Sequence, residues 1–232
     1  MLSKNQIKLI NSLSHKKFRD EHRLFIAEGE KLVNDLMPYF ECVLRVTESD
    51  DLKRVSQLTT PSSVLALFRQ RSQSDPLARV SDNSLLLALD SVQDPGNLGT
   101  IIRTADWFGI RYILCSHQTA DVYNSKVVQS TMGALSRVDV IYCDLEQVLN
   151  DYKQNGWAIY GTFLEGSSIY QTNLNKSKSI IVMGNEGNGI SDKIKQIVTD
   201  KLLIPSFPQD ASTSESLNVA IATAITLSEF RR

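Results

Sequence analysis

The sequence is poor in the features that mark secreted, membrane-spanning and metal-binding proteins. Its 232 residues include only three cysteines, Cys42, Cys115 and Cys143, and three histidines. An odd number of widely spaced cysteines argues against a disulfide framework, and no Cys or His has partners at metal-ligand spacing. No apolar run approaches the roughly 20 residues that cross a bilayer, and the N-terminus lacks the apolar segment of a signal peptide. We therefore expect a cytoplasmic protein with no metal and no membrane partner.

The chain also lacks a large net charge, which is −1 at pH 7. A charge this small gives no overall attraction to nucleic acid. The charge is unevenly spread, however, because residues 1–31 contain seven Lys or Arg and four Asp or Glu, a local excess of +3. Such a region is either the solvated face of a helix or a surface that contacts phosphate, and charge alone favours the solvated face.

Residues 1–70 have the pattern of a small α/β domain. Apolar spacing predicts helices, and short apolar runs predict strands. The helices are expected over 4–13, 31–37 and 52–58, and the strands over 24–27, 42–46 and 64–68. The stretch 69–83 is polar and contains Asp75-Pro76, as linkers often do. We predict a first domain over 1–70, a linker over 71–83 and a second domain over 84–232.

Strands and helices alternate in the second domain. Strands are expected over 85–89, 112–115, 138–142, 157–161, 180–183 and 202–204, and helices over 98–108, 125–132 and 145–152. The run Leu85 to Leu89 is continuously apolar, which is typical of a strand buried on both faces. The alternation predicts an α/β fold with a parallel sheet that helices cover on both faces.

A polar loop follows the predicted strand 85–89. Asp94, Pro95 and Gly96 are typical of a turn, and Asn97 is a candidate N-cap for the helix after it. Arg103 lies six residues further on, inside that helix. An arginine in a helix usually forms a surface ion pair. The alternative is that its planar guanidinium holds a phosphate.

A glycine-rich loop follows the predicted strand 180–183. Three glycines within six residues allow a ligand to approach the backbone closely. Their order, G-x-x-G-x-G, differs from the G-x-G-x-x-G of dinucleotide-binding loops, and the Gly-Lys-Ser/Thr of a phosphate-binding loop is missing. A nicotinamide-dependent oxidoreductase is therefore disfavoured. Glu186 stands among these glycines either as a turn residue or as a carboxylate with a function.

A third polar loop leads into the C-terminal helix. Residues 212–215 have the spacing of a capping box, which predicts a helix start there. Ser216 and Asn218 then fall in the first helical turns, although both are poor helix formers. They are either solvated residues or side chains that face a ligand. Because all three loops follow strands of one parallel sheet, we expect them to converge at one edge, where ligands of open α/β sheets bind.

These segments resemble a known family. DPGNLGTIIRTAD, IVMGNEGNGIS and LLIP with SESLNVAIATA resemble the three motifs of the SpoU (TrmH-type) RNA ribose 2′-O-methyltransferases of the SPOUT superfamily. The N-terminal segments IKLINSL and KKFRDEHRLFIAEGEKLV resemble the small RNA-binding domain of many members. The resemblance implies a C-terminal domain with a deep trefoil knot, S-adenosyl-L-methionine as cofactor, RNA as substrate, and a homodimer whose active site draws on both subunits.

The resemblance also implies the residues of the site. The expected catalytic residues are Asn97, Arg103, Glu186, Ser216 and Asn218. The expected cofactor-binding residues are Thr162, Gly184, Asn185, Gly187, Ile204 and Leu217, contacted mainly through the backbone. We interpret Arg103 as the group that grips a phosphate beside the target ribose, because a guanidinium with a pKa above about 12 is a poor base.

The expected activity is S-adenosylmethionine-dependent 2′-O-methylation of structured RNA, with ribosomal RNA favoured because the N-terminal domain is present. Transfer RNA is the alternative substrate. A further alternative is an RNA-binding ribosome-assembly factor of the same fold with weak catalysis. The segment 206–214 motivates it, because this loop is long, carries Pro208 and has no glycine, unlike the glycine-containing turn usual in the family.

Overall fold

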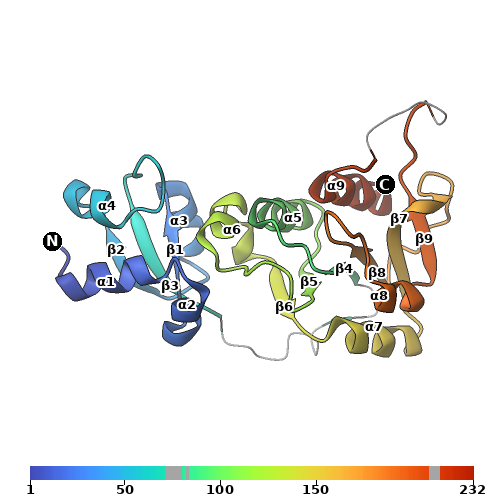
Figure 1. Ribbon diagram of the computed structural model, residues 1–232, viewed down its shortest axis with the longest axis horizontal. Coiled ribbons are helices and arrows are strands. Elements are labelled where there is room, and N and C mark those ends of the chain that lie inside the picture. Colours follow the sequence, from blue (N-terminus) through green and yellow to red (C-terminus); the bar gives the residue numbers. More distant parts are fainter. Residues whose placement is uncertain (72–79, 82–83, 209–214) are drawn as a thin grey trace. The chain divides into compact units, whose positions relative to one another are not determined.

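The computed structural model describes residues 1–71, 80–81, 84–208 and 215–232 (Figure 1). The chain divides into two compact units, each with a sheet of its own. Unit 1 comprises Met1–Ser74 and Asp121–Arg137, and unit 2 comprises Asp75–Ala120 and Val138–Arg232. Most of the expected linker 71–83 lies outside the described residues, so the functional boundary placed there stays a prediction.

Unit 1 is built on a three-stranded antiparallel sheet with the order β1-β3-β2. The strands are β1 (Leu24–Glu28), β2 (Cys42–Val46) and β3 (Leu65–Arg69), as predicted to within one residue. Its first four helices are α1 (Lys4–Ser12), α2 (Lys16–His22), α3 (Glu30–Leu36) and α4 (Ser49–Val55). The sequence patterns missed α2, and they placed α4 three residues late because the acidic first turn of that helix carries no apolar residue.

Strands β1 and β3 of unit 1 are buried on both faces, apart from Arg69 at the end of β3. One face meets α1 and α4 through aliphatic side chains such as Ile10, Leu13 and Leu52. The other face carries an aromatic cluster, in which the ring centroid of Phe25 lies 5.2 Å from that of Phe40 and 5.7 Å from that of Phe68. Burial of these rings adds to the apolar surface that the aliphatic face already removes from water.

The segment Asp121–Arg137 belongs to unit 1, although the strands on either side of it in sequence belong to unit 2. It contains α6 (Ser125–Ser130) and a short 3-10 helix, η2 (Ala134–Ser136). The ring centroid of Tyr123 lies 4.9 Å from that of Phe25, with the two rings tilted by 33°, and the guanidinium of Arg19 donates to Asp121 Oδ2 at 2.6 Å. An aromatic contact and a buried ion pair therefore attach this segment to the N-terminal sheet.

Unit 2 contains a six-stranded parallel sheet with the order β6-β5-β4-β8-β7-β9, which confirms the predicted α/β class. The strands are β4 (Leu85–Leu89), β5 (Tyr112–Cys115), β6 (Asp139–Tyr142), β7 (Ala158–Ser168), β8 (Ser179–Met183) and β9 (Asp200–Leu203). Every residue of β4 and β8 is buried, as expected for the central strands of a sheet covered on both faces.

Helices cover both faces of this sheet (Figure 1). One face carries α5 (Pro95–Trp107) and α9 (Val219–Arg231), which pack against each other. The other carries α7 (Leu145–Gln154) and α8 (Asp192–Ile197), whose apolar side chains pack onto Leu86, Ala88 and Ile180. In the part of the chain that the structure describes, no helix has the length and apolar content needed to cross a bilayer.

The starts of α5 and α9 differ from the predicted ones. Asp94, not Asn97, is the N-cap of α5, because its side chain accepts the hydrogen bond from the Asn97 N–H at 2.8 Å. The expected 94–96 turn is thus the helix entry, with Pro95 in the first turn, where its missing N–H costs nothing.

The capping box predicted at 212–215 does not start α9. Residues 212–214 lie outside the described part, but Glu215 to Leu217 are not helical, and the helix begins at Val219. Its N-cap is Asn218, whose Oδ1 accepts from the N–H groups of Ala220 at 2.9 Å and Ile221 at 3.3 Å. Ser216 and Asn218 therefore precede the helix, and Asn218 has a capping role that the sequence reading denied it.

Candidate active site

The loops after β4, β8 and β9 lie at one edge of the parallel sheet. Strands β4 and β8 are neighbours, and β7 separates β8 from β9. All strands of this sheet run in the same direction, so their carboxyl ends share an edge. Side chains from the loop regions after all three strands are hydrogen-bonded to one another there, and these bonds define the candidate site.

Glu186 binds the loop after β8 to the start of α5. Its carboxylate accepts from the backbone N–H of Gln93 at 3.3 Å and of Asp94 at 3.2 Å, and from Asn97 Nδ2 at 3.0 Å. Partial burial raises the pKa of Glu186, but the hydrogen bonds from Asn97 and from backbone N–H groups outweigh burial and hold this pKa below its ordinary value. The ionised Glu186 side chain thus joins the loop after β8 to the loop after β4.

Asn97 connects Glu186 to the start of the C-terminal helix. Its Oδ1 accepts from Asn218 Nδ2 at 3.0 Å, while its Nδ2 donates to Glu186. Asn218 in turn caps α9. Three of the five expected catalytic residues therefore form one chain of hydrogen bonds, Glu186–Asn97–Asn218, which joins all three sequence motifs.

The glycine-rich loop is held by Asn185, which bonds both to the loop after β4 and to the glycine-rich loop itself. Asn185 Nδ2 donates to the Ser91 carbonyl at 2.7 Å, and Asn185 Oδ1 accepts from Gly187 N at 2.9 Å. A Cβ placed on Gly184 would lie 2.2 Å from the carbonyl carbon of Gly189, so no larger residue fits at position 184. Asn185, Gly184 and Gly187 thus have structural roles in this loop, whatever they bind.

Asp90 is a site residue that sequence reasoning missed. It is 5% exposed and follows β4 directly. Its Oδ2 accepts from Ser191 N at 2.7 Å, and its Oδ1 accepts from Ser91 Oγ at 3.2 Å. Asp90 thereby ties the loop after β4 to the end of the glycine-rich loop. The available signal was an acidic residue placed immediately after a continuous apolar strand.

Arg103 and Ser216 are not part of the hydrogen-bond chain. Both are exposed, and neither forms a hydrogen bond or ion pair with any residue that the structure describes. Arg103 lies on the outer side of α5, one helical turn before Trp107, which is 85% exposed. The planar fork of Arg103 is therefore available to an anionic ligand.

Of the remaining expected cofactor residues, Thr162 lies within β7, which continues to Ser168 instead of ending near Thr162 as expected, Ile204 follows β9, and Leu217 lies in the third loop. Thr162 Oγ1 donates to the Val182 carbonyl at 3.3 Å, which binds the middle of β7 to the end of β8. Ile204 follows β9 directly and is half-buried, and Leu217 is 48% exposed. Within the described residues, no group of three or more His, Cys, Asp or Glu side chains is arranged to hold a metal ion.

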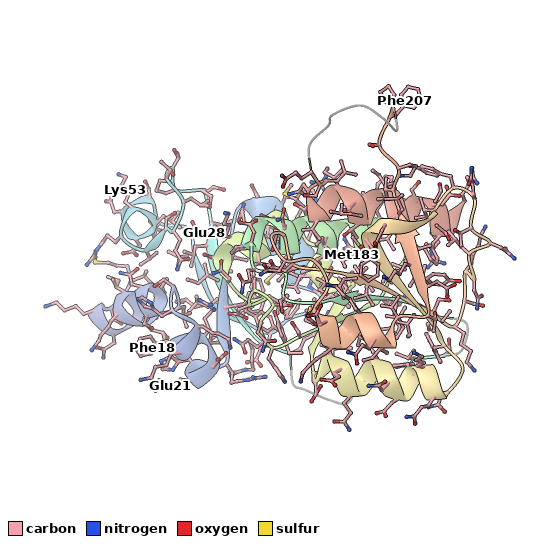
Figure 2. All side chains as sticks on the ribbon, turned by 45° about the vertical axis from the view of Figure 1, so that its right-hand side comes forward. Phe18, Glu21, Glu28, Lys53, Met183 and Phe207 are labelled. Atoms are coloured by element: carbon pink, nitrogen blue, oxygen red, sulfur yellow. The ribbon has the colours of Figure 1, made fainter. Side chains whose placement is uncertain are left out.

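Only residues 206–208 of the atypical loop 206–214 are described. Phe207 is 91% exposed and projects outward from unit 2, whereas Met183 at the end of β8 is buried in the interior (Figure 2). The remainder of the loop, on which the expected change in cofactor binding rests, lies outside the described residues. That expectation stays untested.

Comparison with known proteins identifies the family of the chain. Residues 84–228 match the SpoU rRNA Methylase family, and residues 4–45 match the MRM3-like substrate binding domain. The 23S rRNA (guanosine(2553)-2′-O)-methyltransferase RlmP of Bacillus subtilis is 30% identical, with 99% of this chain and 97% of RlmP covered. The 23S rRNA (guanosine-2′-O-)-methyltransferase RlmB of Neisseria meningitidis is 36% identical over 68% of this chain and 62% of RlmB.

Solved structures also match the whole chain. An RNA methyltransferase of the TrmH family from Porphyromonas gingivalis, so described, is 40% identical with a TM-score of 0.89, and the match covers 100% of this chain and 98% of that one. The AdoMet-bound rRNA methyltransferase of Sinorhizobium meliloti is 29% identical with a TM-score of 0.88, and the match covers 100% and 96%. The chain therefore belongs to the SpoU rRNA methylase family.

Proposed function

We propose that this protein transfers a methyl group from S-adenosylmethionine to a ribose 2′-hydroxyl of ribosomal RNA. The observation that carries the proposal is the Glu186–Asn97–Asn218 chain, which fixes three loops at one sheet edge. Ribosomal RNA is favoured over transfer RNA because RlmP, an rRNA enzyme, matches this chain over 99% of its length, N-terminal unit included.

The residues at this edge fit S-adenosylmethionine. They offer polar groups of Thr162 within β7 and of the loops after β8 and β9, together with the aliphatic side chains of Ile204 and Leu217. Such a set suits an adenosine, which needs apolar contact for its ring and a few hydrogen bonds for orientation. We propose that Thr162, Gly184, Asn185, Gly187, Ile204 and Leu217 hold it. The bound cofactor supplies an electrophilic methyl group.

Arg103 is proposed to position the substrate. Its guanidinium would hold the phosphate next to the target ribose with two parallel hydrogen bonds, which fixes the direction of the 2′-hydroxyl. Ser216, exposed just before Asn218, would hydrogen-bond to the bound ribose or cofactor. The ribose oxygen gains the methyl carbon, the sulfur keeps the bonding electron pair, and the hydroxyl proton passes to water.

Glu186 is a positioning residue in this proposal and not the general base. Its oxygens already accept hydrogen bonds from Gln93, Asp94 and Asn97. Its pKa lies below the ordinary value, because these bonds outweigh the effect of burial, which raises it. A group of such low basicity removes a hydroxyl proton poorly near neutral pH. Its task is to keep the loops after β4 and β8 in place.

Unit 1 is proposed to bind the RNA. A surface hollow of about 430 Å³ is lined by Arg23, Arg69 and Arg71, by the rings of Tyr39 and Phe40, and by Glu41, whose carboxylate accepts from Arg69 Nε at 2.9 Å. The guanidinium carbon of Arg71 lies 4.8 Å from the ring centroid of Phe40, and Tyr39 is 54% exposed. Arginine forks that bind phosphate beside an exposed ring that stacks on a base are the usual means of binding unpaired RNA.

We further propose that two copies of the chain associate and that the C-terminal half of unit 2 forms a trefoil knot. Trp107 on α5 and Ile221 on the neighbouring α9 are 85% and 52% exposed, and exposed apolar side chains on adjacent helices suit a partner surface. Sedimentation of the wild type and of Trp107→Glu tests the association. A monomeric wild type contradicts the proposed association.

The free thiols of Cys42, Cys115 and Cys143 favour the reducing cytoplasm as the location of the protein.

The test of the proposed function uses S-adenosylmethionine with a labelled methyl group. The purified protein is incubated with unmodified rRNA and, separately, with unmodified tRNA. Label in the rRNA fraction supports the proposal, and label in tRNA alone assigns the other substrate. Calorimetric titration with S-adenosylmethionine distinguishes the alternative of a non-catalytic assembly factor, since a protein that does not bind the cofactor transfers no methyl group.

A further inference from the structure

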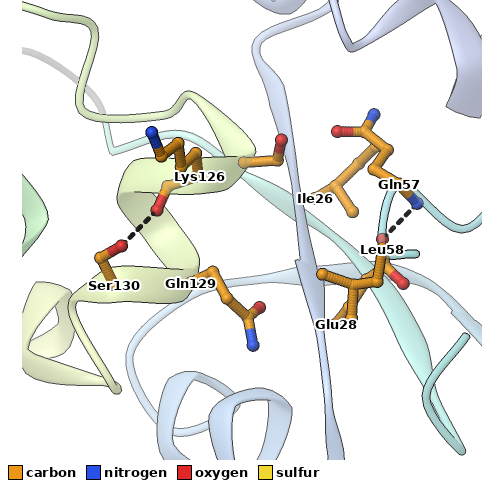
Figure 3. Close-up of a pocket in the computed structure, with 8 residues that line it drawn as sticks. Ile26, Glu28, Gln57, Leu58, Lys126, Gln129 and Ser130 are labelled. Carbon is orange, nitrogen blue, oxygen red and sulfur yellow. Dashed lines mark hydrogen bonds between the residues drawn. The ribbon is translucent and has the colours of Figure 1, made fainter. Parts of the chain in front are cut away.

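Unit 1 has two surface hollows, and they differ in charge. The pocket of about 310 Å³ between β1 and α6 is lined by the acid Glu28 and the base Lys126, whose charges offset each other (Figure 3). The hollow of about 430 Å³ is lined by three arginines and, among the described residues, by a single acid, Glu41. The larger hollow therefore has an excess of positive charge that attracts phosphate, and its arginines differ in how they are held.

Two of the three arginines are already engaged by other groups of the protein. Arg69 Nε donates to Glu41 Oε2 at 2.9 Å, so an acid offsets its charge. Arg71 Nη2 donates to the Ser136 carbonyl at 2.6 Å, which fixes that side chain. Arg23 is the third arginine, and its surroundings are different.

The side chain of Arg23 is exposed and has donors to spare. Its Nη2 donates to the Arg71 carbonyl at 2.9 Å, and it forms no other hydrogen bond and no ion pair with a described residue. A guanidinium carries several N–H donors, so most of those of Arg23 are available. The bond to a backbone carbonyl orients the guanidinium without offsetting its charge. An oriented, uncompensated guanidinium is well suited to a phosphate.

The backbone of Arg23 is in the left-handed region, with φ 54° and ψ 39°. Arg23 follows the last residue of α2, where a left-handed residue commonly ends a helix. Glycine is usual at such a position, because a Cβ is unfavourable in this conformation. An arginine here is therefore less favourable for folding than a glycine would be.

Main-chain and side-chain bonds of unit 1 hold this conformation. The Arg23 N–H donates to the Arg19 carbonyl, and the Gln70 N–H donates to the Arg23 carbonyl at 2.8 Å. Gln70 Nε2 also donates to the carbonyls of Arg19 at 3.1 Å and Leu24 at 3.3 Å. None of these bonds uses the Arg23 side chain, so the turn does not require an arginine. Strained residues that their surroundings hold in place are concentrated at functional sites.

We propose that Arg23 binds one phosphate of an unpaired nucleotide of the RNA substrate, and that the adjoining base stacks on Tyr39. The Tyr39 ring is 54% exposed and lines the same hollow. A paired base is not free to stack on a protein ring, so this combination selects unpaired RNA. The inference rests on the proposed function and deepens it, because it assigns the phosphate contact to Arg23 and names the kind of nucleotide that the hollow holds.

The test replaces Arg23 by glycine, which suits the left-handed conformation and removes the guanidinium. Arg23→Gly should melt at or above the wild-type temperature. Its affinity for an unmodified 23S rRNA transcript at fixed salt should fall roughly tenfold, the loss of one charge-assisted contact. The slope of log affinity against log salt should fall by about 1. A purely structural role predicts instead that stability and affinity fall together.

Three further variants serve as controls. Arg23→Asn tolerates the same backbone conformation and should match Arg23→Gly in RNA affinity. Arg23→Lys keeps the charge without the planar fork, so it should keep the salt slope and restore part of the affinity. Lys178→Gly is the matched control in unit 2, because Lys178 is also a cation in the left-handed region, at φ 50°. It should leave RNA affinity unchanged, and a loss equal to that of Arg23→Gly would overturn the proposal.

Two binding experiments identify what the hollow holds. The wild type should bind a single-stranded RNA more tightly than the duplex of the same sequence, and Arg23→Gly and Tyr39→Ala should each reduce this preference. Equal binding of both RNAs by the wild type would contradict the assignment to an unpaired nucleotide. Titration with inorganic phosphate tests a free anion: phosphate binding that Arg23→Gly abolishes, with transcript affinity unchanged, would overturn the RNA assignment.

Failure of this inference differs from failure of the proposed function. If the wild type transfers no methyl group to rRNA, the proposed function fails. If the wild type methylates rRNA and Arg23→Gly shows an unchanged KM for RNA and an unchanged salt slope, the inference about Arg23 alone is wrong. The expected result is a raised KM for RNA with kcat and S-adenosylmethionine affinity unchanged, because Arg23 contacts RNA and not the reacting atoms.

Discussion

Asn218 Nδ2 donates to Asn97 Oδ1 at 3.0 Å, although 121 positions separate the two residues in sequence. Both amide orientations follow from their other partners. Asn218 Oδ1 accepts from backbone N–H groups of α9, and Asn97 Nδ2 faces the carboxylate of Glu186, which only accepts. A flipped amide at either residue would lose these bonds, so the network has one consistent arrangement.

The first prediction separates the two roles of Asn218. Asn218→Asp keeps the capping oxygen but has no donor for Asn97, whereas Asn218→Ala loses both. We expect Asn218→Ala to lower the free energy of unfolding by about 1–2 kcal/mol, since an N-cap contributes about 1 kcal/mol. Asn218→Asp should retain most of that stability and lose most of the methyl transfer. Urea unfolding measures the stability of both variants, and a methyl-transfer assay measures their turnover. Full activity of Asn218→Asp would contradict the role of the hydrogen-bond network.

Replacement of Arg103 is expected to lower activity without changing stability. It forms no bond with a described residue, so Arg103→Ala should leave the melting temperature unchanged. Its kcat/KM for RNA should fall roughly 100-fold, because the target hydroxyl is no longer held in line. Arg103→Lys should restore only part of this activity, since an ammonium keeps the charge without the planar fork. Equal activity of the Lys variant and the wild type would remove the bidentate role.

The lowered pKa of Glu186 predicts a dependence of stability on pH. A carboxyl group whose folded pKa is depressed stabilises the fold above its unfolded pKa, and this contribution is lost as pH falls through the folded value. The difference in unfolding free energy between the wild type and Glu186→Gln should be constant from pH 7 to about pH 5, then shrink below about pH 4.5, the ordinary pKa. A difference that changed between pH 6 and 7 would contradict the assigned direction.

The buried ion pair of unit 1 is the subject of the fourth prediction. The side chain of Arg19 is 4% exposed and that of Asp121 is 13% exposed. Arg19 also donates to the carbonyls of Leu13 and Ser14 at 2.8 Å. Arg19→Ala leaves Asp121 as a buried, unpaired charge and should destabilise the protein by about 3–5 kcal/mol.

The double variant Arg19→Leu/Asp121→Leu serves as the control for that prediction. It removes both charges and should recover part of the loss, because most of the cost arises from the unpaired partner. Denaturant unfolding measures both variants. A loss below about 1 kcal/mol for Arg19→Ala would mean that Asp121 finds water or another cation when Arg19 is removed.

The sheet of unit 2 was predictable because a parallel strand buried on both faces is a continuous apolar run. Leu85–Leu89 is such a run, and the structure has β4 at those residues. Helix starts were less predictable, because several neighbouring residues can act as caps. Asp94 and Asn97 are both good N-cap residues, and only the long-range bond to Glu186 shows why Asn97 is free for another role.

The sequence patterns did not predict which segments, far apart in the sequence, contact each other. The apolar face of α6 indicates that the helix is packed, but it does not say which sheet it covers, and the structure assigns it to unit 1. The three loops were singled out because each follows a buried strand of one parallel sheet, and the roles of their polar residues came from the resemblance to the family's motifs. The hydrogen bonds between these residues, and the role of Asp90, depend on the order of the strands in the sheet. A single sequence does not reveal that order.

The most direct test of the central claim is the chemical position of the transferred methyl group. The wild type and Arg103→Ala are incubated with unmodified rRNA and methyl-labelled S-adenosylmethionine, and the RNA is then hydrolysed with alkali. We predict that the wild type leaves one labelled dinucleotide resistant to alkali, since a methylated 2′-oxygen cannot attack the adjacent phosphate, and that Arg103→Ala leaves almost none. Label recovered entirely in alkali-sensitive mononucleotides would place the methyl group on a base and contradict 2′-O-methylation.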